Sequence, residues 1–172
     1  MQIGIPVIKD LVLVGGGHSH VAVLKAFGMR PLAGVRITLI SRETQTIYSG
    51  MLPGLIAGHY SIDQAHIDLA PLTRFAGARF IRGEVIGIDH QAKTVSLAGR
   101  PPVSYDILSL NSGSTPSTSA VTGTEGVVIP VKPIDQFLVH WQHLLQRLEA
   151  CDGKARIAVI GGGAGGVELA LA

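Results

Sequence analysis

Two glycine-rich segments of the sequence have the spacing that binds phosphate groups. Gly15 and Gly17 follow the apolar residues 10–14, and a second cluster, with Gly161, Gly163 and Gly166, follows the apolar residues 155–160. In such a loop one glycine permits a sharp turn, the next lets the backbone approach a diphosphate, and a third lets the helix pack closely. The free N–H groups and the dipole of the following helix then favour an anion. The spacing therefore predicts two dinucleotide-binding loops.

The two loops differ at their third position. The second loop has the complete pattern Gly-x-Gly-x-x-Gly, whereas His20 stands where the first loop should have its third glycine. The helix and strand must then lie further apart, or the ring must turn away. His18 and His20 are candidates to donate hydrogen bonds to an anion, and the alternative is that both are ordinary loop and helix residues. We expect no metal site from this pair alone.

The end of the second apolar strand is the usual place for a carboxylate that binds a ribose. Here that strand ends in the sequence LISRE, so Ser41 stands at the expected acidic position and Glu43 follows two residues later. We expect Ser41 or Glu43 to contact the ribose. Arg42 either meets a phosphate or remains a solvated charge.

These residues need a particular set of elements around them. Residues 10–14 and 35–40 are predicted to be strands and residues 19–29 a helix, which together form a βαβ unit. Residues 48–60 contain three glycines and a proline, which indicates a loop with a short helix. Residues 67–77 are predicted to be helical.

Four short β-rich pieces follow, at residues 78–83, 84–89, 93–97 and 102–110. The middle pieces are predicted to form an antiparallel meander, and residues 107–110 to return to the main sheet. Residues 127–131 and 155–160 are also predicted to be strands, and residues 133–150 a helix with one apolar stripe. The sequence therefore indicates an α/β fold.

Composition limits the possible partners and the compartment. Of the 172 residues 47% are apolar and 15% charged, the net charge is +2, and no dense basic run occurs, so we expect no nucleic-acid partner. Cys151 is the single cysteine, which fits a reducing compartment. No run of the sequence has the pattern of a signal peptide or the length of a membrane span. These features predict a cytoplasmic protein.

A third motif points to a known family. Residues 105–116 read YDILSLNSGSTP, which resembles the YDxLxxATGSxP segment of the two-dinucleotide-binding-domain flavoproteins, the FAD/NAD(P)-dependent pyridine nucleotide-disulfide oxidoreductases. Asn111 and Ser112 stand where that segment has Ala-Thr. The closing GGGAGGVELA resembles the NAD(P)H loop of the same family. The absence of a CxxC motif argues against its disulfide reductases. The segments GGGHSHV and YSGMLPG resemble its type II NADH dehydrogenase-like branch, in particular the flavoprotein unit fused to selenide, water dikinase.

The resemblance implies a fold and a set of cofactor contacts. It implies a Rossmann-like FAD-binding domain, with a parallel sheet and an antiparallel meander, at residues 1–132. A linker helix at 133–153 and an incomplete NAD(P)H-binding domain at 154–172 would follow. FAD would contact three groups of residues: the first loop and ribose region (Gly15, Gly17, His18, Ser19, His20, Ser41, Arg42, Glu43), the flavin and adenine surroundings (Gly50, Met51, Pro53, Val85), and the segment after the last strand (Asn111, Ser112, Gly113, Ser114). NAD(H) or NADP(H) would contact Gly161, Gly163, Gly166 and Glu168.

The implied activity is transfer of a hydride from NAD(P)H to FAD and of electrons onward to an acceptor such as a quinone. No catalytic side chain is assigned, because the cofactors carry the chemistry. The sequence resembles an N-terminal piece of such an enzyme, which we expect to be inactive alone and to touch a membrane only through elements outside this chain. Its exposed apolar end predicts a homodimer, a domain swap or disorder of that end. A sulfide:quinone reductase-like flavoprotein and a non-catalytic nucleotide-binding sensor are the alternatives.

Overall fold

The computed structural model describes residues 6–116, 122–123, 126–151 and 155–172. The chain forms two compact units. Unit 1 comprises Met1–Tyr48 and His66–Ser112, and unit 2 comprises Ser49–Ala65 and Gly113–Ala172. The domain boundaries after residues 132 and 153 stay predictions.

Unit 1 is built on a four-stranded sheet in which all the strands are parallel. The strands are β1 (Lys9–Val14), β2 (Val35–Ser41), β5 (Arg79–Arg82) and β9 (Ile107–Leu110), in the order β5-β2-β1-β9. The three strands predicted at residues 10–14, 35–40 and 107–110 are thereby confirmed. The first of the four β-rich pieces, β5, also joins this sheet.

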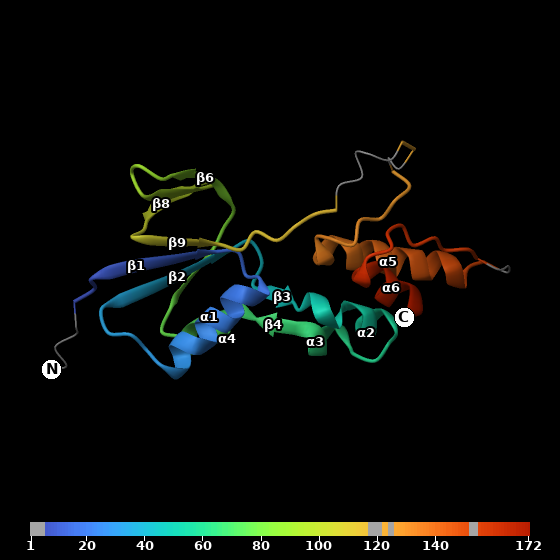
Figure 1. Cartoon of the computed structure of the whole chain (residues 1–172), viewed down its shortest axis with the longest axis horizontal. Helices are drawn as coiled ribbons and strands as arrows, with labels where there is room; N and C mark the ends of the chain where they lie inside the picture. The colour runs from blue at the N-terminus through green and yellow to red at the C-terminus, as the bar shows by residue number, and fades with distance from the viewer. Residues whose placement is uncertain (1–5, 117–121, 124–125, 152–154) are drawn as a thin grey trace. The chain divides into compact units, whose positions relative to one another are not determined.

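Two helices cover one face of the sheet. They are α1 (His18–Met29) and α4 (Leu69–Phe75), and Figure 1 shows both on the same side of the strands. The core of this layer consists of Leu13, Leu24, Ile37, Leu39 and Leu69, all almost fully buried. Since strand side chains alternate between faces, Leu13 of β1 and Ile37 and Leu39 of β2 point to this face, where they pack against the helix residues Leu24 and Leu69.

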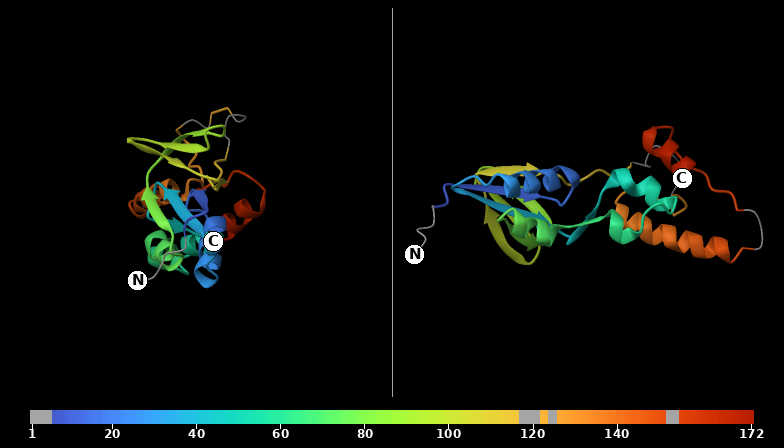
Figure 2. Two further views of the ribbon diagram at one scale, coloured as in Figure 1. Left: turned by 90° about the vertical axis from the view of Figure 1, so that its left-hand side faces the viewer. Right: turned by 90° about the horizontal axis from the view of Figure 1, so that it is seen from below.

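The opposite face of the sheet is covered by an antiparallel meander. It consists of β6 (Val85–Asp89), β7 (Thr94–Leu97) and β8 (Arg100–Ser104), as predicted for the middle pieces. Val12 and Ile40 pack there against Val95 and Leu97. The left panel of Figure 2 shows the sheet between the meander and the helices. A parallel sheet covered on both faces explains why its strands read as nearly continuous apolar runs.

A small antiparallel pair, β3 (Gln45–Ile47) with β4 (His66–Asp68), was not predicted. Each strand has three residues, which is too short for an alternating pattern to stand out. The N–H of Leu69 donates to the carbonyl oxygen of Thr44 at 2.9 Å, so this pair also fixes the start of α4.

Unit 2 is helical in its described residues. It contains a 3₁₀ turn η1 (Ser49–Met51), α2 (Leu52–Ile56), α3 (Ile62–Ala65), α5 (Ile134–Glu149) and α6 (Ala164–Leu171). The helix predicted at 133–150 is confirmed, with Pro133 directly before its first turn. Phe137 is its buried residue and stacks on Trp141.

The strands predicted at residues 127–131 and 155–160 are wrong, because both segments are irregular. A β-strand requires a hydrogen-bonded neighbour, and no strand in the described part of the chain pairs with either segment. Apolar runs identify segments suited to a sheet interior, but they do not supply the partner strand. None of the described helices combines the length and the hydropathy required to cross a bilayer.

Candidate functional site

The first glycine loop lies where the connections of the parallel sheet change direction. Chain order runs outward from β1 to β2 and β5 on one side, and β9 lies on the other side. Val14 ends β1 and is paired with Leu110, which ends β9. Ligands of open α/β sheets bind at such a point, outside the carboxyl ends of the strands.

At each of the three loop glycines, a side chain would collide with a neighbouring group. Gly15 has φ +95°, and a Cβ there would lie 2.1 Å from the carbonyl oxygen of Asn111. A Cβ at Gly16 would lie 2.4 Å from the Leu69 side chain, and one at Gly17 would lie 2.4 Å from Asn111 Nδ2. The backbone N–H groups of Gly15 and Asn111 donate to Ile40 and Val14 at 2.8 Å. The loop therefore packs closely against the end of β9.

The buried His20 side chain stabilises this loop through hydrogen bonds. Its side chain is 2% exposed, with Nδ1 2.7 Å from the Gly15 carbonyl oxygen and Nε2 2.9 Å from Ser109 Oγ. A carbonyl oxygen only accepts, so Nδ1 carries a proton and donates to it, while Nε2 shares a hydrogen bond with the Ser109 hydroxyl. The expectation that the ring turns away is wrong, because it turns inward onto the loop. Both ring nitrogens are occupied, so His20 shapes the loop and does not face an anion.

The start of α1 is open. Gly17 is its N-cap with φ −68° and ψ 170°, and the N–H groups of His20 and Val21 donate back to the Gly17 carbonyl oxygen at 3.0 and 3.1 Å. His18 and Ser19 are exposed, and the His18 ring stacks on Tyr48 with centroids 4.2 Å apart. The N–H groups that precede His20, at His18 and Ser19, have no acceptor within the helix. They are therefore available to an anion here.

Asn111 adds a further donor beside the loop. Its Nδ2 is buried and has no hydrogen-bond partner among the described residues. Such a group costs about 1–3 kcal/mol when it stays unpaired. The glycine spacing does not predict the position of Asn111 Nδ2 beside the loop. It also does not predict the contacts that Ser109, Leu69 and Tyr48 make with the loop and the start of α1. All of these residues come from elements distant in the chain.

The predicted ribose region lies beside the same loop. Ser41 ends β2, and its Oγ would lie 3.1 Å from a Cβ at Gly16. Arg42 and Glu43 are exposed, and Arg82 donates from Nε to the Arg42 carbonyl oxygen at 3.1 Å. Val85 begins β6 and packs on the meander core. Ser112 follows Asn111 and is exposed.

The remaining predicted contacts lie in unit 2. Gly161 has φ +118°, Gly163 is the N-cap of α6 with φ −73° and ψ 170°, and a Cβ at Gly166 would lie 2.0 Å from the Gly161 carbonyl oxygen. A pocket of about 290 Å³ in this unit is lined by Gly50 and Pro53 together with Glu168. Met51 belongs to η1 beside them, and Gly113 and Ser114 are exposed.

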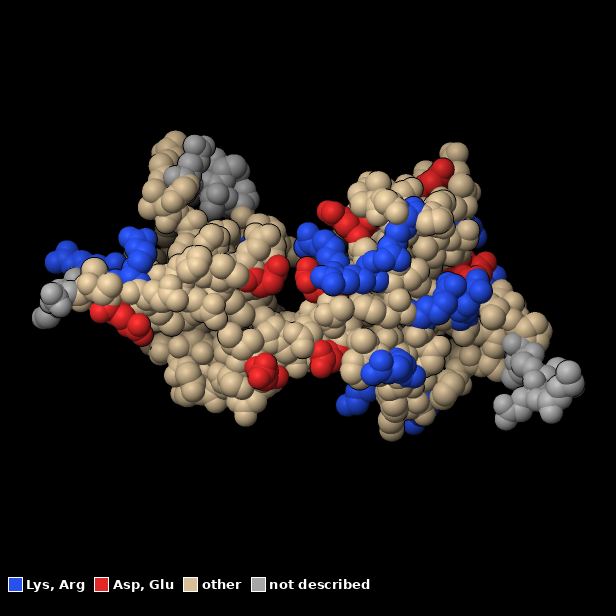
Figure 3. Space-filling model, turned by 180° about the vertical axis from the view of Figure 1, so that it is seen from behind, with Lys and Arg blue, Asp and Glu red and all other residues tan. Residues whose placement is uncertain are grey.

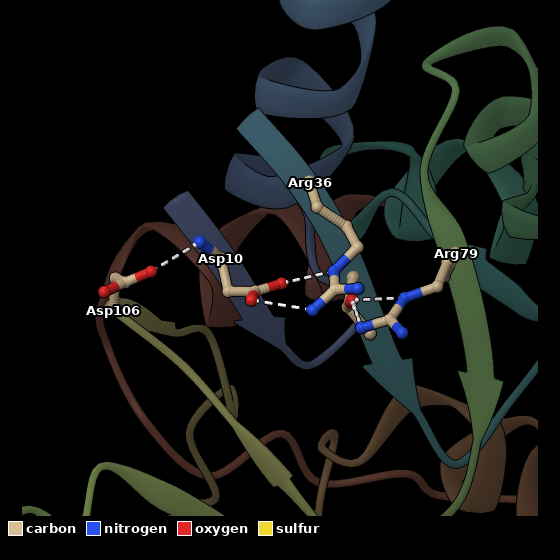
Figure 4. Close-up of polar contacts among 5 residues, drawn as sticks. Asp10, Arg36, Arg79 and Asp106 are labelled. Atoms are coloured by element: carbon tan, nitrogen blue, oxygen red, sulfur yellow. Dashed lines mark hydrogen bonds and ion pairs between the residues drawn. The ribbon is translucent and has the colours of Figure 1, made fainter. Parts of the chain in front are cut away.

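A polar network joins the strands of unit 1 at their other ends. Figure 4 shows Asp10 receiving two hydrogen bonds from Arg36, while the Asp10 N–H donates to Asp106 Oδ2 at 2.7 Å. Arg79 donates to the hydroxyl of Thr38, which is buried. The hydrogen bonds from Arg36 hold the pKa of Asp10 below its ordinary value. On the face of unit 1 drawn in Figure 3, Lys and Arg side chains lie beside Asp and Glu side chains.

A covered parallel sheet, with a glycine loop and a helix start at its switch point, defines a Rossmann-type α/β protein. Residues 9–172 match the family described as pyridine nucleotide-disulphide oxidoreductase, and the chain belongs to that family. The resemblance to this family, drawn from the motifs, is thereby confirmed.

Among curated relatives, the chain is 30% identical over 169 residues to the NADH dehydrogenase-like protein YutJ of Bacillus subtilis (strain 168), covering 95% of this chain and 44% of the relative. It is 30% identical over 119 residues to the sulfide-quinone reductase of Aquifex aeolicus (strain VF5), covering 69% of this chain and 26% of the relative. The chain therefore spans less than half the length of these relatives.

Solved structures share the fold. The sulfide:quinone oxidoreductase of Aquifex aeolicus matches with TM-score 0.67 and 28% identity, over 84% of this chain and 33% of that one. NDH2 from Plasmodium falciparum in complex with NADH matches with TM-score 0.72 and 20% identity, over 94% of this chain and 36% of that one.

Proposed function

We propose that this chain is part of an FAD-dependent NAD(P)H oxidoreductase and that unit 1 holds the adenosine diphosphate portion of FAD. The observation that carries the proposal is the first glycine loop at the switch point. There the open N-terminus of α1 and the unpaired Asn111 amide gather donors that have no protein acceptor. A diphosphate supplies the acceptor oxygens that such a group of donors requires.

The residues of unit 1 then have distinct tasks toward the cofactor. The N–H groups of the loop and of the first turn of α1, at Gly17, His18 and Ser19, bind the diphosphate. Ser41 or Glu43 binds the ribose hydroxyl groups, and Val85 backs the adenine. His20 has a supporting task, because it holds the Gly15 carbonyl from the buried side.

Bound FAD supplies the capacity to accept a hydride from a reduced nicotinamide. In unit 2 the loop of Gly161, Gly163 and Gly166, with Glu168, is proposed to bind that nicotinamide dinucleotide. Gly50, Met51 and Pro53 are proposed to approach the flavin side, and Gly113 and Ser114 to line the cofactor. The chain's part is to bind and orient both molecules, and a quinone is the proposed final acceptor.

Reconstitution with FAD tests the proposal. We expect the chain to retain FAD through desalting, seen as a flavin absorbance band near about 450 nm, and the variant Gly17→Ala to lose it. Gly87→Ala is the matched control, because a Cβ there meets only ordinary contacts at 3.8 Å. Retention of FAD by Gly17→Ala, or no retention by the unmodified chain, would contradict the proposal.

Addition of NADH separates enzyme from sensor. A protein extended to the length of the curated relatives is expected to lose its flavin band on addition of NADH, and this chain alone is expected to keep it. Tight binding of nucleotide with no bleaching in the longer protein would favour the sensor instead.

A sulfide:quinone reductase-like activity is the second candidate, favoured by the 30% identity to the Aquifex aeolicus reductase. Sulfide oxidation in such a candidate requires reactive thiols, and this chain contributes only the exposed Cys151. Bleaching of the flavin by sulfide but not by NADH, in the longer protein, would select this activity.

A further inference from the structure

We propose that Asn111 is a cofactor-positioning residue whose Nδ2 group donates a hydrogen bond to a diphosphate oxygen of the dinucleotide bound at the first glycine loop. The inference rests on the proposed function, since it requires a dinucleotide there. It adds a contact that the glycine spacing does not contain, on a residue that replaces the alanine of the resembling motif.

The backbone of Asn111 is fixed by two contacts. Its N–H donates to the Val14 carbonyl oxygen at 2.8 Å, so the residue continues the pairing of β9 with β1. Its own carbonyl oxygen lies against the Cα of Gly15, where a Cβ would come within 2.1 Å. The side chain therefore starts from a rigid position directly beside the loop.

The carboxamide lies over Gly17, the residue at which a bound diphosphate approaches the backbone most closely. A Cβ at Gly17 would meet Asn111 Nδ2 at 2.4 Å, Cγ at 2.7 Å and Oδ1 at 2.8 Å. Gly17 is also the N-cap of α1, a twelve-residue helix, so the Asn111 carboxamide lies beside the start of that helix. The carboxamide and the helix start thus belong to one site.

The site contains hydrogen-bond donors without matching protein acceptors among the described residues. Asn111 Nδ2 is buried and makes no hydrogen bond with any described residue, so the side chain does not serve the fold through its amide. An alanine would avoid the cost of an unpaired buried donor. A cluster of N–H donors at the positive end of a helix is completed by an anionic oxygen, and an oxygen of a diphosphate meets that requirement.

Asn111 is the sole asparagine of the sequence, which makes a direct measurement possible. A chain labelled with ¹⁵N at asparagine gives one side-chain ¹⁵N resonance, seen as a single pair of cross-peaks in an NMR spectrum. We expect this signal to shift when ADP is added and to stay in place when adenosine, which lacks the diphosphate, is added. The same titrations by calorimetry give the affinities for ADP, adenosine and FAD.

The variant Asn111→Ala separates a positioning role from a structural one. We expect it to bind ADP and FAD about 10- to 100-fold more weakly, to bind adenosine within about twofold of the unmodified chain, and to show an unchanged or higher thermal midpoint without ligand. Asn111→Asp keeps the shape but repels the diphosphate, so its loss for ADP is larger. Gln91→Ala, which removes an exposed carboxamide from the turn between β6 and β7, is the control and changes none of these values.

Each contrary result has a distinct meaning. Unchanged ADP affinity in Asn111→Ala overturns the role of Asn111 and leaves the proposed function standing. A parallel loss of ADP affinity, adenosine affinity and thermal midpoint also overturns it, since that pattern marks a structural residue. If the unmodified chain binds neither FAD nor ADP, the proposed function fails and this inference fails with it.

Discussion

At the scale of single residues, the first glycine loop is held by two different parts of Asn111. We expect Gly17→Ala to lower the free energy of unfolding by about 1–3 kcal/mol, because its Cβ collides with the Asn111 carboxamide. The double variant Gly17→Ala/Asn111→Ala should regain about half of that loss, because the colliding atoms are gone. Urea denaturation of the single and double variants measures this coupling.

Gly15→Ala provides the control for that cycle. Its Cβ would collide with the backbone carbonyl of Asn111, and Gly15 has φ +95°. Removal of the Asn111 side chain relieves neither problem, so the double variant Gly15→Ala/Asn111→Ala should show no recovery. Equal recovery in both pairs would mean that the side-chain contact does not set the requirement for Gly17.

His20 yields a prediction that runs against the motif. His20→Gly restores the complete Gly-x-Gly-x-x-Gly spacing, yet we expect it to lower the free energy of unfolding by about 3 kcal/mol. The reasons are the loss of two hydrogen bonds, an internal cavity and a glycine within a helix. His18→Gly, at the exposed first residue of the same helix, is the control and should cost about 1 kcal/mol or less. A more stable His20→Gly chain would show that the histidine is merely tolerated.

At the scale of elements, the pair of Asp10 on β1 and Arg36 on β2 should make stability depend on pH. Arg36 holds the pKa of Asp10 below its ordinary value, so the carboxylate stabilises the fold above about pH 4, the ordinary range of Asp. That contribution is lost as the pH falls through the lowered pKa. Arg36→Gln should therefore lower the thermal midpoint by roughly a few degrees at pH 7, with the difference shrinking below about pH 4.

Arg100→Gln is the control for that measurement. Arg100 is exposed at the start of β8 and forms no ion pair with the described residues. Its substitution should leave the midpoint unchanged across the same pH range. A difference for Arg36→Gln that persists at low pH would show that its effect does not come from the charge of Asp10.

The elements that the sequence predicts well are those whose pattern is local. The apolar runs of β1 and β2, the helix between them and the stripe of α5 follow from burial on known faces. For the candidate site, the sequence predicts the positions of the loop glycines and of the residues that end the strands. The sequence does not predict the inward orientation of the His20 ring, because its partner Ser109 lies 89 residues away in the chain. The irregular residues 155–160 show the same limit, since a strand depends on a partner that its own sequence does not contain.

At the scale of the whole molecule, the chain contains the same loop geometry twice. Gly17 and Gly163 are N-caps with nearly identical backbone angles, −68° and 170° against −73° and 170°. The two loops differ at the third position. In the second loop the Cα of Gly166 packs closely against the Gly161 carbonyl oxygen, where a Cβ would not fit. In the first loop the His20 ring forms a hydrogen bond with the Gly15 carbonyl oxygen. The first-glycine carbonyl is therefore held in both loops, by close packing in one and by a hydrogen bond in the other.

The segment around the second loop also exposes large apolar side chains. Ile157 is 56% exposed, Ile160 65% and Leu171 84%. Exposed apolar surface of this kind favours association, so we expect two copies of this chain to associate through residues 157–171. Analytical ultracentrifugation at tens of micromolar should show a dimer for the unmodified chain and a monomer for Ile157→Lys/Ile160→Lys.

The meander offers a matched control for that association. Ile86 and Ile88 on β6 are 66% and 43% exposed, so Ile86→Lys/Ile88→Lys adds the same charge at a similarly exposed apolar site in the other unit. If residues 157–171 form the interface, this variant stays dimeric, because its charges lie outside the contact. Dissociation by both pairs of substitutions would instead mean that association follows total exposed apolar area. A monomeric unmodified chain at every concentration would exclude the dimer, and it would leave the exposed isoleucines of the second loop without a role in self-association.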